Sequence, residues 1–328
     1  MLGGYFIITM KEEIKKQGYK VYEKLREIKT TRVRSYLLNS KYPQKENFER
    51  ILPKFIEIER KLNLQDVDKF VQPRWVKDYK MMSNNVSDFN FSFLRNEIIR
   101  GTMFVTAEGK LMRGQLRFIK ENSGSLDIKY ILEEEYIGNP IISNKEYKTS
   151  HNTIHNFYHL SFYLKTTNIN PFKEKNIIEW GGGYGNLARL FQKVNSNQTY
   201  TIIDLPVFSC IQWIYLSSIF GEENVNMIES SKDKIIEGQI NILPVCFIED
   251  FDLKADLFIS TWALTESSEY SQEYVFNKKM FGARDILLAF HNESSKDFNS
   301  TPIIKYINKN KLKKIPIKNQ EGNSYVFK

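Results

Sequence analysis

The chain has 328 residues, of which 41% are hydrophobic and 26% are charged. This balance is typical of a folded globular protein and excludes a fibrous or largely disordered chain. No apolar run reaches the roughly 18 residues of a membrane span, and the N-terminus has no cleavable signal pattern. We therefore expect a cytoplasmic protein without a membrane-spanning segment.

The first predicted region covers residues 1–150. Between residues 10 and 80, apolar residues recur at three- and four-residue spacing, which predicts several amphipathic helices. Shorter β-leaning runs broken by glycines predict small strands and turns, at 102–106, 115–119 and 126–132. We expect a mainly helical accessory region with a small β segment.

The second predicted region, residues 151–328, alternates between helix and strand. Helices are predicted at 151–165, 186–194, 206–220 and 303–308. Apolar runs of strand length are predicted at 176–180, 200–203, 243–248, 256–260 and 285–290. The tail predicts an antiparallel hairpin, with strands at 315–318 and 324–327. We therefore expect an α/β, Rossmann-like domain with a seven-stranded mixed sheet that ends in an antiparallel hairpin.

A glycine-rich segment, Glu-Trp-Gly-Gly-Gly-Tyr-Gly at 179–185, lies between the first predicted strand and the next helix. Such a turn brings free N–H groups close to a nucleotide-type ligand. The dinucleotide fingerprint G-x-G-x-x-G fails because its last glycine is replaced by Asn186, which disfavours NAD and FAD. Glu179 would repel a pyrophosphate, whereas S-adenosylmethionine (SAM) carries a sulfonium and an ammonium. The segment predicts SAM as cofactor, bound by Glu179, Gly181, Gly183, Tyr184 and Gly185.

Acidic residues also follow the second and third predicted strands. Asp204, with Leu205 after it, lies where a carboxylate can accept the ribose hydroxyls of a nucleoside. Asp250 is placed to accept the adenine amino group, and Phe251 to cover the ring. Thr261, at the end of the fourth strand, completes the predicted cofactor site.

Taken together, these motifs resemble those of class I SAM-dependent methyltransferases. More narrowly, the chain resembles a family of sugar O-methyltransferases from bacterial surface-polysaccharide and capsule gene clusters. The resemblance covers about residues 130–295 and rests on segments 137–140, 178–188, 203–206 and 256–267. It implies transfer of a methyl group to a sugar hydroxyl, with S-adenosylhomocysteine (SAH) as product. The sugar would be nucleotide-linked or a polysaccharide precursor.

Methyl transfer to a hydroxyl requires a base beside the reacting oxygen. The acceptor is expected beyond the fourth strand, where Glu266 is the only carboxylate of residues 261–266. His291 follows the fifth strand, and His155 and His159 share one helix face. We therefore predict Glu266, His291, His155 and His159 as candidate catalytic residues.

The sequence predicts no metal site. The candidates His291-Asn292-Glu293 and Glu249-Asp250 lack a spacing specific to any metal. The two cysteines, Cys210 and Cys246, lie inside apolar segments and offer neither a disulfide framework nor a zinc ligand set.

Other functions stay open at the level of sequence. A nucleic-acid methyltransferase would suit the net charge of +8, but the basic run at 308–318 has no aromatic residue to stack a base. A methyltransferase that acts on another small molecule is also left open. A non-catalytic methyltransferase-fold binding module is the third class. The predicted partner is a sugar or nucleotide sugar, with nucleic acid disfavoured and a homo-oligomer left open.

Overall fold

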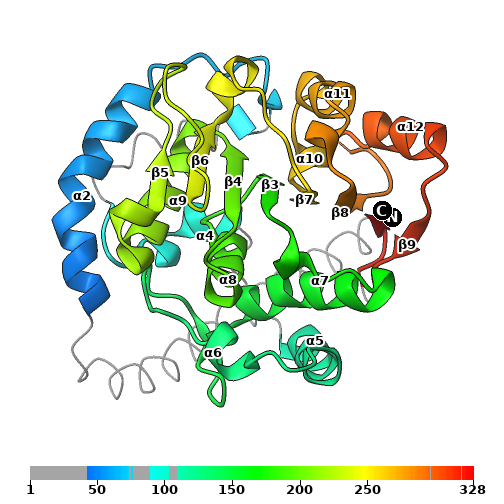
Figure 1. Cartoon of the computed structure of the whole chain (residues 1–328), viewed down its shortest axis with the longest axis horizontal. Coiled ribbons are helices and arrows are strands. Elements are labelled where there is room, and N and C mark those ends of the chain that lie inside the picture. The colour runs from blue at the N-terminus through cyan, green and yellow to red at the C-terminus, as the bar shows by residue number, and fades with distance from the viewer. Residues whose placement is uncertain (1–42, 74, 77–88, 103–108, 296, 319) are drawn as a thin grey trace, which may run out of the picture.

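The first described element is a long helix of the N-terminal region. The structure, a computed structural model, describes residues 43–73, 75–76, 89–102, 109–295, 297–318 and 320–328. Amphipathic helices predicted before residue 43 lie outside this part. After residue 43, helix α2 (Pro43–Leu62) confirms the prediction of an amphipathic helix. The residues of its buried apolar face are Phe48, Ile51, Phe55, Ile58 and Leu62. This face packs along α9 (Pro206–Phe220) at the edge of the molecule (Figure 1).

The described residues of 97–102 and 109–132 are mainly helical, so the strands predicted at 115–119 and 126–132 are wrong. The helices are α4 (Glu97–Thr102), α5 (Gly109–Asn122) and α6 (Ile128–Leu132). Helix α5 buries Met112, Leu116 and Ile119, which follow a helical period that the short window of the prediction did not capture. The predicted run at 102–106 lies almost entirely outside the described residues. A short hairpin of β1 (Ile142–Asn144) and β2 (Thr149–Ser150) is the β segment described in this region.

The main sheet has eight strands in the order β5-β6-β4-β3-β7-β8-β10-β9. Their bounds are β3 (Asn176–Trp180), β4 (Thr199–Asp204), β5 (Val225–Met227), β6 (Ile240–Pro244), β7 (Leu257–Thr261), β8 (Asp285–His291), β9 (Lys314–Pro316) and β10 (Asn323–Phe327). Strands β3 to β8 pair in parallel, whereas β10 runs antiparallel to both β8 and β9. The Rossmann-like class I methyltransferase fold is thus confirmed, with β5 added as one more edge strand than predicted.

The helices that precede or connect the strands along the chain pack around the sheet (Figure 1). They are α7 (His151–Thr167), α8 (Asn186–Val194), α9, α10 (Ala263–Glu266), α11 (Glu269–Asn277) and α12 (Thr301–Lys309). The buried apolar residues of α2 and most of those of the sheet belong to one continuous cluster. The domain boundary predicted between residues 150 and 151 stays a prediction. Buried apolar residues from both sides of this position belong to the same cluster. None of the described helices combines the length and apolar character needed to cross a bilayer.

The strand order positions a crevice at one edge of the sheet. From β3 the chain moves by way of α8 to β4 and β6 on one side, and later returns to β7 and β8 on the other. In open parallel sheets, ligands bind outside the carboxyl ends of the strands at this reversal.

Candidate active site

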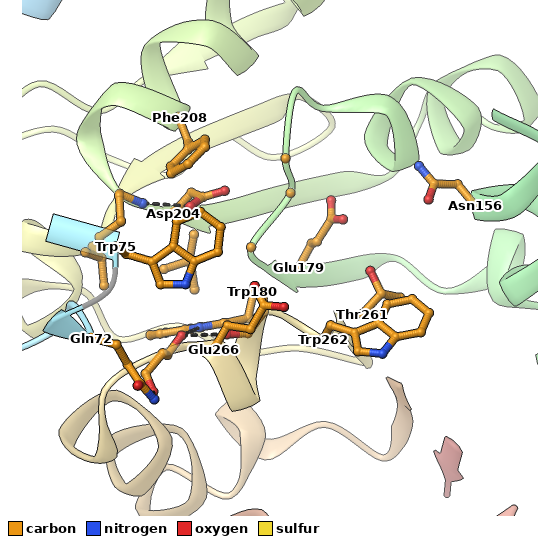
Figure 2. A pocket seen from close by; sticks show the side chains of 18 of the residues that line it. Gln72, Trp75, Asn156, Glu179, Trp180, Asp204, Phe208, Thr261, Trp262 and Glu266 are labelled. Atoms are coloured by element: carbon orange, nitrogen blue, oxygen red, sulfur yellow. Dashed lines mark hydrogen bonds between the residues drawn. The ribbon is translucent and has the colours of Figure 1, made fainter. Parts of the chain in front are cut away.

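One pocket of about 490 Å³ lies at the carboxyl ends of the parallel strands (Figure 2). Its walls come from the ends of β3, β4, β6, β7 and β8, from α7, and from Phe70, Val71, Gln72 and Trp75 of the N-terminal region. Ligand sites in proteins commonly measure about 300–1,000 Å³. The pocket therefore has the place and the size of a small-molecule site.

Most residues predicted for the site line this pocket. They are His155, Glu179, Gly181, Gly183, Asp204, Leu205, Thr261, Glu266 and His291. The structure does not bring the others to its wall, namely Tyr184, Gly185, His159, Asp250 and Phe251. Tyr184 is buried behind the glycine-rich segment, where its ring packs edge-on against Tyr215 at 5.0 Å.

The glycines at 181–185 are required for different reasons. Gly181 has φ +79°, and a Cβ there would lie 2.0 Å from the Cβ of Ala263, so the loop packs directly on α10. At Gly185, with φ +93°, a Cβ would lie 2.9 Å from Leu216 Cδ1. Gly183 has φ +57° but no atom within 4 Å of a built Cβ. The loop therefore needs glycine both for close packing against neighbouring residues and for its left-handed backbone conformation.

Asp204 is fixed at the end of β4 by the loop and by α9. Its Oδ1 accepts a hydrogen bond from Leu205 N at 2.8 Å, and its Oδ2 accepts one from Gln212 Nε2 at 2.7 Å. The same Gln212 nitrogen lies 3.0 Å from the carbonyl oxygen of Gly183. Burial raises the pKa of Asp204 to about 7. No sequence pattern marks Gln212, because it lies within a helix that is buried along nearly its whole length.

Glu179 is a buried acid in the fourth position of β3. Its Oε2 accepts a hydrogen bond from Tyr200 Oη at 2.8 Å. Burial nevertheless raises its pKa to about 8. Together with Asp204 and Glu266 it makes the pocket wall acidic, and no Lys or Arg is among the described residues that line it. A cation fits this wall better than a phosphate.

We expect a cationic ligand to bind more tightly as the pH rises from 6 to 9. A positive charge beside Glu179 and Asp204 favours the ionised forms of these two raised-pKa acids, so binding of the ligand releases protons. For each proton released, the affinity for the ligand increases by up to about tenfold per pH unit. Calorimetry in buffers of different ionisation enthalpy measures the release. Glu179→Gln should flatten the pH dependence. An affinity independent of pH would contradict the expectation.

The ligand-free protein should show the opposite trend in stability. Between the ordinary Glu pKa of 4.5 and the raised value of about 8, folded Glu179 keeps a proton that the unfolded chain has released. The contribution of this residue to the free energy of unfolding therefore falls as the pH rises through that window. Urea titrations of the wild type and of Glu179→Gln check this sign.

His155 and His159 form a buried chain of rings beside the pocket. Nδ1 of His155 is 2.7 Å from Gln115 Nε2, and its Nε2 is 3.2 Å from Nε2 of His159. Nδ1 of His159 is 2.5 Å from Tyr325 Oη. Burial lowers the pKa of His155 to about 3 and that of His159 well below its ordinary value. With both nitrogens engaged and a low pKa, these rings are weak bases, and the geometry favours a positioning role over the predicted catalytic one.

Glu266 and His291, two of the predicted catalytic candidates, lie close together on the pocket wall. Glu266 Oε1 lies 3.5 Å from His291 Nε2, and both side chains are largely buried. The imidazole of His291 stacks on Phe298, with ring centroids 3.7 Å apart. A carboxylate beside an imidazole can support proton transfer. This pair is the better candidate for the base.

Trp262, the residue immediately before α10, has a strained backbone. Its φ is +66°, a region that costs a bulky residue free energy and that proteins retain mainly at functional sites. Its Nε1 donates to Asn323 Oδ1 at 2.8 Å, and its ring stacks on His155 with centroids 5.7 Å apart. The ring is therefore held in one orientation on the pocket wall (Figure 2).

At the opposite end of the pocket, aromatic residues come from places that sequence reasoning missed. Trp75 packs edge-on against Phe208 of α9, with ring centroids 6.2 Å apart, and both lie near Asp204 in Figure 2. Gln72 Nε2 donates to the carbonyl oxygen of Ser267 at 2.8 Å, which ties this segment to the turn after α10. No motif marks Trp75, because its role depends on a contact with residues far along the chain.

Asp250 and Phe251 lie outside the pocket because the third strand ends earlier than predicted. Strand β6 ends at Pro244, and residues 245–250 form a 3-10 helix where the prediction continued the strand to 248. Val245 is therefore the residue of this segment that reaches the pocket. Asp250 is exposed, one residue after Glu249, which pairs with Lys69.

A buried ionic network lies behind the pocket, between α7 and α8. Arg189 of α8 contacts Glu135 Oε2 through Nη1 at 2.5 Å, and its Nη2 donates to Thr153 Oγ1 at 3.1 Å. Thr153 of α7 in turn donates to Glu134 Oε1 at 2.6 Å, and Lys193 Nζ contacts Glu135 Oε1 at 2.6 Å. The network joins the segment before β1 to both helices, and α7 carries part of the pocket wall.

Within the part of the chain that the structure describes, no group of three His, Cys, Asp or Glu side chains is arranged to hold a metal ion.

Comparisons with known proteins concern the fold. No model of a known protein family and no curated protein matches the sequence. Similar solved structures include magnesium protoporphyrin IX methyltransferase (ChlM) from Synechocystis PCC 6803 with bound SAH, at 10% identity over 67% of this chain and 94% of that chain, with a TM-score of 0.39. The mitomycin 7-O-methyltransferase MmcR has 10% identity over 76% of this chain and 81% of that chain, with a TM-score of 0.36. Coclaurine N-methyltransferase has 11% identity over 82% of this chain and 74% of that chain, with a TM-score of 0.36. At this level of similarity none of them assigns a ligand or substrate, and the strand order is what shows that the chain has the class I methyltransferase fold.

Proposed function

We propose that the chain is a SAM-dependent O-methyltransferase that transfers a methyl group to a hydroxyl of a sugar. The observation that carries the cofactor assignment is the acidic, glycine-lined pocket end formed by Glu179, Asp204 and the loop at 181–183. Its carboxylates suit a ligand with an ammonium, a sulfonium and ribose hydroxyls, whereas a dinucleotide would bring phosphates to this wall. Trp75 and Phe208 add an aromatic enclosure near Asp204 that fits a nucleoside base.

Bound SAM would supply a methyl group carried on a positively charged sulfur. The residues of the chain align the acceptor hydroxyl and take its proton. Glu266 and His291 form the base, in which the imidazole receives the proton and the carboxylate stabilises the resulting cation. Thr261, at the end of β7, lies beside Trp262 on the pocket wall (Figure 2). The choice of a sugar rests on the resemblance of the sequence motifs.

Binding of SAH, compared with NAD, tests the proposal. Calorimetry is expected to show binding of SAH alone, and Asp204→Ala should weaken it by about 10- to 100-fold, because a hydrogen bond to a charged group contributes roughly 1.5–3 kcal/mol. Asp250→Ala is the matched control. This acid ends the 3-10 helix that follows the neighbouring strand β6, but it is exposed and does not line the pocket. Binding of NAD without SAH would refute the cofactor assignment.

A further inference from the structure

The end of the pocket away from Asp204 has a distinct chemistry. We define the acceptor end as Asn156, Trp262, His291, Gln320 and Asn323, all of which line the pocket. They come from α7, the turn after β7, the end of β8 and the β9–β10 hairpin. Figure 2 places Asn156 and Trp262 across the pocket from Asp204, with the amide of Asn156 turned toward the cavity. Three of the five side chains are therefore neutral amides.

Two polar atoms of the acceptor end are buried without a hydrogen-bond partner among the described residues. They are Gln320 Oε1 and His291 Nε2, of which the second makes no hydrogen bond but lies 3.5 Å from the carboxylate of Glu266. Folded proteins seldom leave such atoms unpaired, because the lost solvation is costly, so a ligand is expected to satisfy them. A hydroxyl group suits both, since it can donate its one hydrogen to Gln320 Oε1 and accept a hydrogen bond from a protonated His291 Nε2.

Trp262 gives the acceptor end a rigid flat surface. Its ring is fixed by the hydrogen bond to Asn323 and by the stacked ring of His155. An indole ring offers a large apolar area at little cost in conformational entropy. Amides that bind hydroxyls, beside a fixed aromatic ring that packs against C–H groups, are a combination suited to a carbohydrate.

The charges of the wall decide between a free and a phosphate-linked sugar. Proteins hold phosphates mainly with Arg and Lys side chains. The described residues of the pocket wall include neither, while Glu179, Asp204 and Glu266 add acidic groups. Among the described residues of the wall, a pyrophosphate would therefore meet acidic groups and neutral amides, with no Lys or Arg side chain to bind it.

We propose that the acceptor end binds an uncharged sugar, presented as a glycoside, and excludes the pyrophosphate of a nucleotide-linked sugar. The inference rests on the proposed methyltransferase function and narrows its acceptor. Asn156 and Gln320 are then residues that determine specificity through hydrogen bonds to hydroxyl groups.

Saturation-transfer NMR on the SAH complex of the full chain tests this inference. One sample contains a mixture of methyl glycosides of common hexoses and deoxyhexoses, and the other contains the same sugars linked to UDP or dTDP. We expect signals from glycosides alone. Gln320→Ala and Asn156→Ala should reduce these signals at least fivefold without changing SAH affinity, whereas Asn197→Ala, at an exposed site away from the pocket, should leave them unchanged.

The outcomes separate the two proposals. If calorimetry shows no SAH binding, the methyltransferase function itself fails. If SAH binds but the sugar signals come only from nucleotide-linked forms, or from no sugar, the uncharged acceptor is refuted while the cofactor assignment stands. Unchanged glycoside signals in both amide variants would also overturn the assigned binding site. Thermal melting of each variant shows whether it remains folded.

Discussion

Gly181→Ala is expected to weaken SAH binding by at least about a hundredfold. The new methyl group would lie 2.0 Å from the Cβ of Ala263, and φ at this position is +79°. A left-handed backbone costs a non-glycine residue about 1–2 kcal/mol, and forcing an extra carbon into a packed site costs about 1–3 kcal/mol more. Relief of this clash moves the loop away from α10 and distorts the part of the pocket formed by Glu179, Asp204 and the loop at 181–183. Calorimetry with SAH measures the loss.

Gly238→Ala is the matched control for this substitution. Its φ of +74° is nearly the same, but no atom lies within 4 Å of a built Cβ, and the residue does not line the pocket. This variant should carry the backbone strain alone, with a lower melting temperature and normal SAH affinity. Equal affinities for SAH in both variants would show that contact between the loop and α10 does not shape the site.

Arg189→Met is expected to reduce the free energy of unfolding by about 3–5 kcal/mol. The guanidinium is fully buried, and its removal takes away the cation beside the buried carboxylate of Glu134 and leaves Glu135 paired with Lys193 alone among the described residues. Removing one member of a buried ion pair leaves an uncompensated charge, which accounts for the size of the effect. Urea unfolding followed by circular dichroism measures the change.

Arg50→Met provides the comparison for a surface charge. Arg50 contacts Glu222 at 2.8 Å, but its side chain is 60% exposed. Solvent screens such a pair, so the variant should lose no more than about 1 kcal/mol. If the two substitutions had similar effects, the network between α7 and α8 would not be important for stability.

The α/β half of the chain could be predicted well because local signals agree there. Buried strands of nearly continuous apolar residues alternate with helices, and Pro206 and Gly221 mark the two ends of α9. The prediction is wrong at residues 115–119 because short runs of mixed polarity look alike in a strand and in a helix. The end of β6 was also misplaced, since the apolar run continues into the 3-10 helix at 245–250. That error carried Asp250 and Phe251 into the predicted site.

The candidate site could be predicted best where its residues lie at the carboxyl ends of strands. Glu179, Asp204 and Thr261 are found this way, because the carboxyl ends of parallel strands meet at one edge of a sheet. Trp75, Gln320 and other wall residues reach the pocket through tertiary contacts that have no local pattern. The same limit applies to the histidines, whose burial and mutual contacts decide their basicity.

The segment that includes Phe70 and Gln72 also has a consequence for how the protein acquires its activity. The hydroxyl of Ser271 donates to the carbonyl oxygen of Phe70 across 201 positions of the chain, and Gln72 reaches Ser267 across 195. Contacts so distant in sequence form slowly, because the intervening chain must be ordered first. During synthesis the pocket cannot close until the residues around 270 have left the ribosome. A ligand that binds only this finished pocket stabilises the complete fold over any shorter nascent form.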